Sequence, residues 1–156
     1  MTRPRLSVLL AALAAALLAG AAGARTVSPA AAAKAVVRAH TAALEKGDWQ
    51  AVCGTLDRAA FASNGSSVAD CADEYPYTIR SGNGFEGDVY DGGAKITRVV
   101  TKTLDANRVN VFTLWWVGPW NQYSVLEFAV HREFDRGQKG AFRIVSQTWV
   151  RCLPAP

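Results

Sequence analysis

The sequence has few residues of the kinds that hold metals. It contains two histidines, His40 and His131, and three cysteines, none of them in a CxxC spacing. A structural zinc site takes four ligands from closely spaced Cys and His residues, so we expect no metal, and no cofactor motif is present either. The sequence also lacks a GxSxG element and a GxxxxGK[ST] loop, which argues against a serine nucleophile elbow and a phosphate-binding loop.

Long apolar runs are absent after the first 24 residues. Arg3 and Arg5 precede an apolar run over 6–18, and small residues fill 19–24. This pattern is typical of a secretory signal peptide cleaved after Ala24. The run is shorter than the roughly 20 residues of a membrane-spanning helix. We expect residues 1–24 to be a signal peptide and 25–156 to form one secreted, extracytoplasmic domain without a stable membrane anchor; an uncleaved amino-terminal anchor is the alternative.

Neither sign of charge dominates the expected mature chain. Removal of residues 1–24 takes away two of the seventeen basic residues and none of the acidic ones, which leaves fifteen against thirteen. The basic residues are scattered among acids, so the electrostatic field that attracts nucleic acid is missing. We therefore expect no nucleic-acid partner.

The three cysteines predict at least one disulfide in an oxidising compartment. Cys53 and Cys71 enclose a short segment with a flexible Ser-Asn-Gly-Ser stretch, and we expect them to pair. Closing a loop of this size contributes about 3 kcal/mol. Cys152 is then left over. A buried, inert thiol is favoured for it, and pairing with another chain or exchange with the first pair are the alternatives.

The first third of the expected domain has helical patterns. Ser28 followed by Pro29 is a helix start, and 30–46 contains no helix breaker. Gly47 ends this helix, and Asp48 caps a second one over 49–56. A third helix is expected over 67–74, with Ser67 as its cap. A disulfide between Cys53 and Cys71 would clamp two helices that are individually too short to persist.

The chain from residue 95 onward alternates with a period of two. Four segments, 95–104, 108–117, 122–134 and 141–151, are rich in Val, Ile, Thr and aromatic residues and are separated by short turns. Short connections require antiparallel neighbours, so we expect a four-stranded meander with the helices on one face. A further short edge strand is expected over 87–90.

The order of these elements, together with the motif AALEKGDWQAVCGTL at 42–56, resembles the nuclear transport factor two-like (SnoaL-like) superfamily, in particular its small exported bacterial members. The resemblance implies an α+β, cystatin-like roll: a cone-like, curved antiparallel sheet wrapped around the amino-terminal helices, with a cavity between them. The superfamily includes isomerases, dehydratases, hydrolases and polyketide cyclases, and also domains that only bind or dimerise, so the fold does not choose a function.

Enzymes of this fold use a base beside a hydrogen-bond donor in a dry pocket. On the third strand Glu127, His131 and Glu133 share one face, while Leu126, Phe128, Val130 and Phe134 share the other, which is the better core. His131 is therefore a candidate base oriented by a glutamate such as Glu127. The favoured interpretation, however, is that these polar side chains form a solvated outer face of the sheet. His40 lies on an apolar helical stripe and is either a hydrogen-bonded core residue or a pocket histidine.

Aromatic residues favour binding over chemistry. Trp115 and Trp116 are adjacent in a strand and must face opposite sides, and Trp120 lies at a hairpin tip. Tyr75 and Tyr90 are candidates to close the mouth of the cone. The resemblance also implies a homodimer through the outer sheet face.

Two functional hypotheses remain open. The favoured one is a non-catalytic exported domain that binds a small apolar ligand or a protein partner through the cone cavity or the outer sheet face. The alternative is an isomerase, dehydratase or hydrolase acting on a small carbonyl or polyketide-like compound, with His131, Glu127 or His40 as catalytic residues. No complete set of acid, base and donor emerges from the sequence, which favours the first hypothesis.

Overall fold

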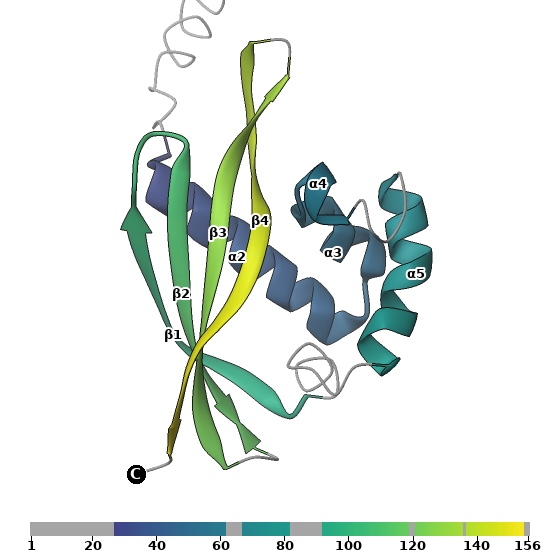
Figure 1. Ribbon diagram of the computed structural model, residues 1–156, viewed down its shortest axis with the longest axis vertical. Helices are drawn as coiled ribbons and strands as arrows, with labels where there is room; N and C mark the ends of the chain where they lie inside the picture. The colour runs from purple at the N-terminus through teal and green to yellow at the C-terminus, as the bar shows by residue number, and fades with distance from the viewer. Residues whose placement is uncertain (1–26, 62–66, 82–91, 119–120, 136, 155–156) are drawn as a thin grey trace, which may run out of the picture.

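A computed structural model of the protein describes residues 27–61, 67–81, 92–118, 121–135 and 137–154. Within these ranges four helices precede four strands, so the fold is α+β as expected (Figure 1). The helices are α2 (Pro29–Lys46), α3 (Trp49–Thr55), α4 (Arg58–Phe61) and α5 (Val68–Ser81). The strands are β1 (Ala94–Thr103), β2 (Arg108–Val117), β3 (Gln122–Asp135) and β4 (Gln138–Pro154). The expected signal peptide and the edge strand expected over 87–90 lie outside the described residues.

The predicted helical hairpin is confirmed by its caps. The Ser28 hydroxyl accepts a hydrogen bond from the Ala31 amide at 3.2 Å, with Pro29 at the first helical position. Gly47 ends α2 in the left-handed conformation, with φ of 64°, which favours a residue without a Cβ atom. The Asp48 carboxylate then accepts from the Ala51 amide at 3.0 Å and begins α3. These local interactions turn the chain back on itself.

The third predicted helix is longer than expected. Its cap is reciprocal, because the Asp70 amide donates to the Ser67 hydroxyl at 3.1 Å and the Ser67 amide donates to the Asp70 carboxylate at 3.0 Å. The helix continues through Pro76 to Ser81 instead of ending at Glu74. Tyr75 is buried and its ring lies 6.1 Å from that of Trp49, so a tertiary contact holds the turn in which the proline lies.

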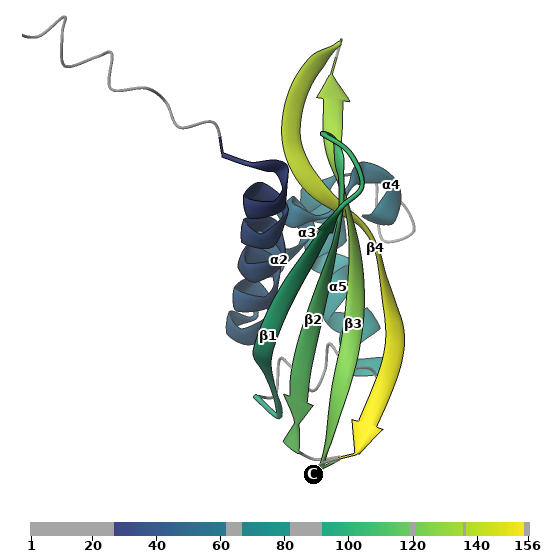
Figure 2. The same ribbon diagram turned by 90° about the vertical axis from the view of Figure 1, so that its left-hand side faces the viewer.

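The four strands form the predicted antiparallel meander in the order β1-β2-β3-β4. The pairing of β2 with β3 is regular, whereas that of β3 with β4 is interrupted by three register shifts. Strand β4 begins at Gln138, three residues earlier than expected. Figure 2 shows α2 alongside one face of this twisted sheet. None of the described helices is long and apolar enough to cross a membrane.

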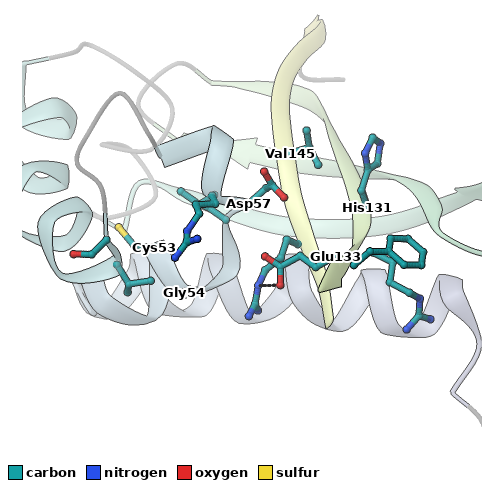
Figure 3. A pocket seen from close by; sticks show the side chains of 13 residues that line it. Cys53, Gly54, Asp57, His131, Glu133 and Val145 are labelled. Atoms are coloured by element: carbon teal, nitrogen blue, oxygen red, sulfur yellow. Dashed lines mark ion pairs between the residues drawn. The ribbon is translucent and has the colours of Figure 1, made fainter. Parts of the chain in front are cut away.

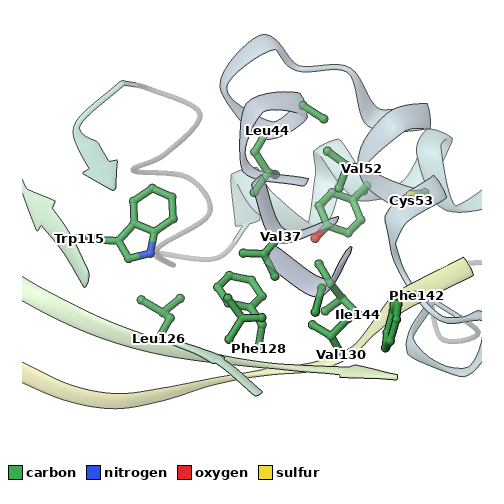
Figure 4. Packing of buried hydrophobic residues seen from close by; sticks show 14 of the residues in the cluster. Val37, Leu44, Val52, Cys53, Trp115, Leu126, Phe128, Val130, Phe142 and Ile144 are labelled. Atoms are coloured by element: carbon green, nitrogen blue, oxygen red, sulfur yellow. The ribbon is translucent and has the colours of Figure 1, made fainter. Parts of the chain in front are cut away.

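The core lies between α2, α3 and the inner face of the sheet, meaning the face toward the helices (Figure 4). Its largest buried side chains include Leu44, Trp115, Leu126, Phe128 and Ile144. The expected opposite orientation of the two tryptophans is confirmed, since Trp115 is fully buried and Trp116 is half-buried on the outer face.

The assignment of Phe134 to the core was wrong. Leu126, Phe128 and Val130 are buried as predicted, but the Phe134 side chain is 54% exposed. A register shift between Arg132 and Phe134 breaks the alternation of β3, and the β3–β4 hairpin extends past the helices at this end (Figure 1).

The predicted disulfide is present between Cys53 of α3 and Cys71 of α5, whose Cα atoms are 6.1 Å apart. Both residues are fully buried. The bond therefore joins the two short helices, as expected. The side chain of Cys152 lies outside the part of the chain that the structure describes.

Candidate functional site

A cleft of about 720 Å³ lies between the short helices and the hairpin end of β3 and β4 (Figure 3). Its first side, which we call the helical wall, includes Cys53, Gly54, Leu56, Asp57, Arg58 and Val68. Its second side, the strand wall, is formed by His131, Arg132, Glu133, Phe134, Arg143 and Val145. The cleft thus joins parts of the chain that are far apart in the sequence.

The connection between α3 and α4 fixes the position of the helical wall. Leu56 ends α3 in an extended conformation and forms an isolated parallel bridge with Ile144 of β4. The Asp57 amide donates to the Ile144 carbonyl at 2.8 Å. The Asp57 carboxylate accepts from the Ala59 amide at 2.9 Å and so caps α4. These backbone and capping bonds hold Asp57 and Arg58 beside the edge of β4.

The strand wall contains an ion pair and a stacked arginine. The Arg143 Nε atom lies 3.3 Å from a Glu133 carboxylate oxygen. The Arg132 guanidinium lies 4.4 Å from the centre of the Phe142 ring and donates to the Gly140 carbonyl at 3.2 Å. Its Nε atom is buried, and within the described residues it has no hydrogen-bond partner. The strand wall therefore presents two guanidinium groups and one carboxylate.

Only one of the three predicted catalytic residues lines this cleft. His131 is in the strand wall, next to Glu133, which the sequence also placed on that face. Glu127 does not line it; its carboxylate accepts a 2.5 Å hydrogen bond from the Asn110 side chain. Four residues along a strand span about 13 Å, so the structure does not bring Glu127 and His131 together.

His40 lies in the core, away from the cleft. Its Nδ1 atom is 2.8 Å from the Thr55 hydroxyl, which donates its own proton to the Val52 carbonyl at 2.6 Å. Thr55 must then accept from Nδ1–H, so Nε2 is the unprotonated nitrogen. Nε2 is buried and has no hydrogen-bond partner among the described residues. Burial lowers the pKa of His40 to about 4, and the backbone of Val52 opposes this only in part.

The predicted ligand-binding aromatic residues that the structure describes do not lie together in one site. Tyr75 is buried in α5 beside Trp49. Trp116 is on the outer sheet face, with its ring centre 5.1 Å from that of Tyr123. Tyr90 and Trp120 lie outside the described residues.

Several cleft residues could not be identified from the sequence. Arg58, Phe134, Arg143 and Val145 were not identified as site residues, because their proximity depends on the pairing of Leu56 with Ile144. The one local signal was the Leu56-Asp57-Arg58 run, in which Asp57 has the residue type of a helix cap.

Within the described residues no group of three or more His, Cys, Asp or Glu side chains is placed to hold a metal ion. Comparison with known proteins identifies no relative: no family model, no curated protein and no solved structure matches this chain.

Proposed function

We propose that this protein is a non-catalytic domain that binds a small molecule in the cleft between the helical wall and the strand wall. The observation that carries the proposal is the cleft itself. Its volume of about 720 Å³ falls in the range of roughly 300–1,000 Å³ that is typical of ligand sites. Apolar and charged side chains are both present on each of its walls, which is the composition that binds and orients a small ligand.

As part of the same proposal, the chain has the cone fold of the nuclear transport factor two-like superfamily and is exported. A capped helical hairpin, a disulfide-bonded helix and a four-stranded antiparallel meander support the cone of the nuclear transport factor two-like superfamily. The signal-like sequence over 1–24 supports export, and the Cys53–Cys71 bond is compatible with an oxidising compartment.

An enzyme with His131 as its base is less well supported. A histidine base is usually oriented by a hydrogen bond that its ring N–H donates to a third group, and among the residues that the structure describes none bonds to the His131 imidazole. Glu127 is engaged with Asn110, and His40 is in the core. Glu133, the nearest acid in the chain, is paired with Arg143.

The outer sheet face supports a second candidate function, which is contact with a protein partner or a second copy of the chain. Phe112, Leu114, Trp116 and Tyr123 are half-buried on this face, which none of the described helices covers. Large apolar side chains gathered on a sheet face are typical of contact surfaces. None of these four residues lines the cleft.

Filling the cleft tests the proposed function. Gly54 lines the cleft, and a Cβ atom added to it would meet no heavy atom within 4 Å. Small molecules that raise the melting temperature of the mature protein should bind Gly54→Trp at least tenfold more weakly, because the indole occupies their space. Gln50→Trp adds the same side chain at an exposed position of α3 outside the cleft and should bind like the parent.

The ligands recovered after incubation should be chemically unchanged by mass spectrometry. Equal binding by Gly54→Trp and the parent would place the site elsewhere. If the parent converts a ligand into a product and His131→Ala does not, the protein is an enzyme and the proposed binding function is wrong.

A further inference from the structure

The cleft has the same two features on both of its walls. The helical wall carries Arg58 and an exposed apolar side chain, Val68, which is 39% exposed. The strand wall carries Arg143 and the exposed ring of Phe134. A molecule between the walls would therefore meet a guanidinium group and an apolar surface from each side.

The charges of the cleft do not cancel. Three arginines, 58, 132 and 143, line the cleft with two acids, 57 and 133, so the arginines exceed the acids by one. Of the acids, Glu133 is paired with Arg143, and Asp57 caps α4. Within the described ranges Arg58 forms no ion pair, and Arg132 is bound to a carbonyl and a ring, neither of which carries a negative charge.

The strand pairing places His131 between two arginines. His131 is the direct cross-strand neighbour of Arg108 on β2 and of Arg143 on β4. Arg108 is paired with Asp105 at 2.7 Å and does not line the cleft, and Arg143 is paired with Glu133. Among the described residues Arg58 is the cleft arginine whose charge no acid and no aromatic ring engages. A guanidinium group binds a carboxylate through two parallel hydrogen bonds, so this arrangement favours an oxyanion.

We infer that the ligand of the cleft is a small amphiphilic organic acid. This inference rests on the proposed function and adds the chemical class of the ligand. The oxyanion lies between Arg58 and Arg143, and the apolar body lies against Val68 and Phe134. Burial of the apolar body contributes most of the affinity, and the two arginines select the charge.

Three probes of one chain length test the inference: octanoate, octanol and octylammonium, titrated into the mature protein below their micelle-forming concentrations. Octanoate should bind about tenfold more tightly than octanol, because its carboxylate forms ion pairs with the guanidinium groups, whereas the octanol hydroxyl carries no charge. Octylammonium should bind more weakly than octanol, because its charge has the same sign as the arginines.

Variants of the charged residues separate the two walls. Arg58→Gln and Arg143→Gln should each weaken octanoate binding by about three- to tenfold, because an ion pair that is partly exposed to solvent is weak. The same variants should weaken octanol binding much less, because the uncharged hydroxyl forms no ion pair and the glutamine amide can still donate to it. Arg98→Gln removes an exposed arginine of β1 outside the cleft and should change neither. Glu133→Gln should strengthen octanoate binding, because it frees Arg143; a misfolded variant would not show such a gain.

The outcomes distinguish this inference from the proposed function. Equal affinity for octanoate and octanol, or unchanged octanoate binding in both arginine variants, would overturn the organic-acid ligand and leave an apolar-ligand cleft. Absence of binding by all three probes would overturn the organic-acid ligand. If, in addition, Gly54→Trp binds the same small molecules as the parent with equal affinity, the proposed function is overturned as well.

Discussion

His40 is the residue whose chemistry depends most strongly on its surroundings. In the folded protein burial lowers its pKa from 6.5 to about 4. In the unfolded chain the imidazole takes up a proton below about pH 6.5, whereas in the folded state it stays neutral down to about pH 4. Stability is therefore lost as the pH falls through this window, and by linkage the free energy of unfolding should be about 2 kcal/mol lower at pH 5 than at pH 7.

Urea denaturation at the two pH values measures this loss. His40→Leu should largely abolish it, because the titrating group is gone. His131→Gln removes the other histidine and should retain the loss in full. Equal stability of the parent at both pH values would show that His40 does not titrate as described. The same conclusion follows if the loss of stability disappears in His131→Gln and persists in His40→Leu.

Residues that act on their immediate neighbours could be predicted from the sequence. Ser28, Gly47 and Asp48 have the cap and turn roles that their residue types indicate, because each role is fixed within four residues along the chain. Arg58 and Arg143 have no such local signature. Their shared cleft exists only after Asp57 has bonded to the edge of β4.

At the scale of elements, α5 depends on its attachment to α3. Among the described elements its main contacts are with α3, and they include the disulfide and the Trp49–Tyr75 ring pair. Val68, at the start of α5, lines the cleft. Loss of the disulfide should therefore release α5 and one side of the site before the sheet is affected.

Hydrogen exchange of the double variant Cys53→Ala/Cys71→Ala tests this attachment. We expect a loss of about 3 kcal/mol in global stability and the largest loss of protection in α5, with β2 and β3 less affected. Cys152→Ala should keep the parent pattern. A double variant in which α5 retains its protection, or in which all elements lose it equally, would contradict the proposed role of the bond.

Element boundaries were less predictable than element types. The strands were identified by their alternation, yet β4 begins earlier and α5 continues past Pro76. Both extensions depend on tertiary contacts. Tyr75 is held by Trp49, and the start of β4 is held by the end of β3 through the pairs Asp135–Gln138 and Phe134–Lys139.

At the scale of the whole molecule, the cleft results from a difference in length between two layers. The helices cover one face of the sheet, and the β3–β4 hairpin continues beyond them (Figure 1). Phe134 and Arg143 belong to this uncovered end, where a register shift has exposed the ring that the sequence assigned to the core. The sequence predicted both layers, but not where one layer ends relative to the other.

The most direct measurement is an amide chemical-shift map of the mature protein titrated with octanoate. We predict that the largest shifts fall on both walls of the cleft, at Gly54, Val68, Phe134 and Arg143. Shifts confined to the outer sheet face around Leu114 and Trp116, or no saturable shifts at all, would contradict ligand binding in the cleft.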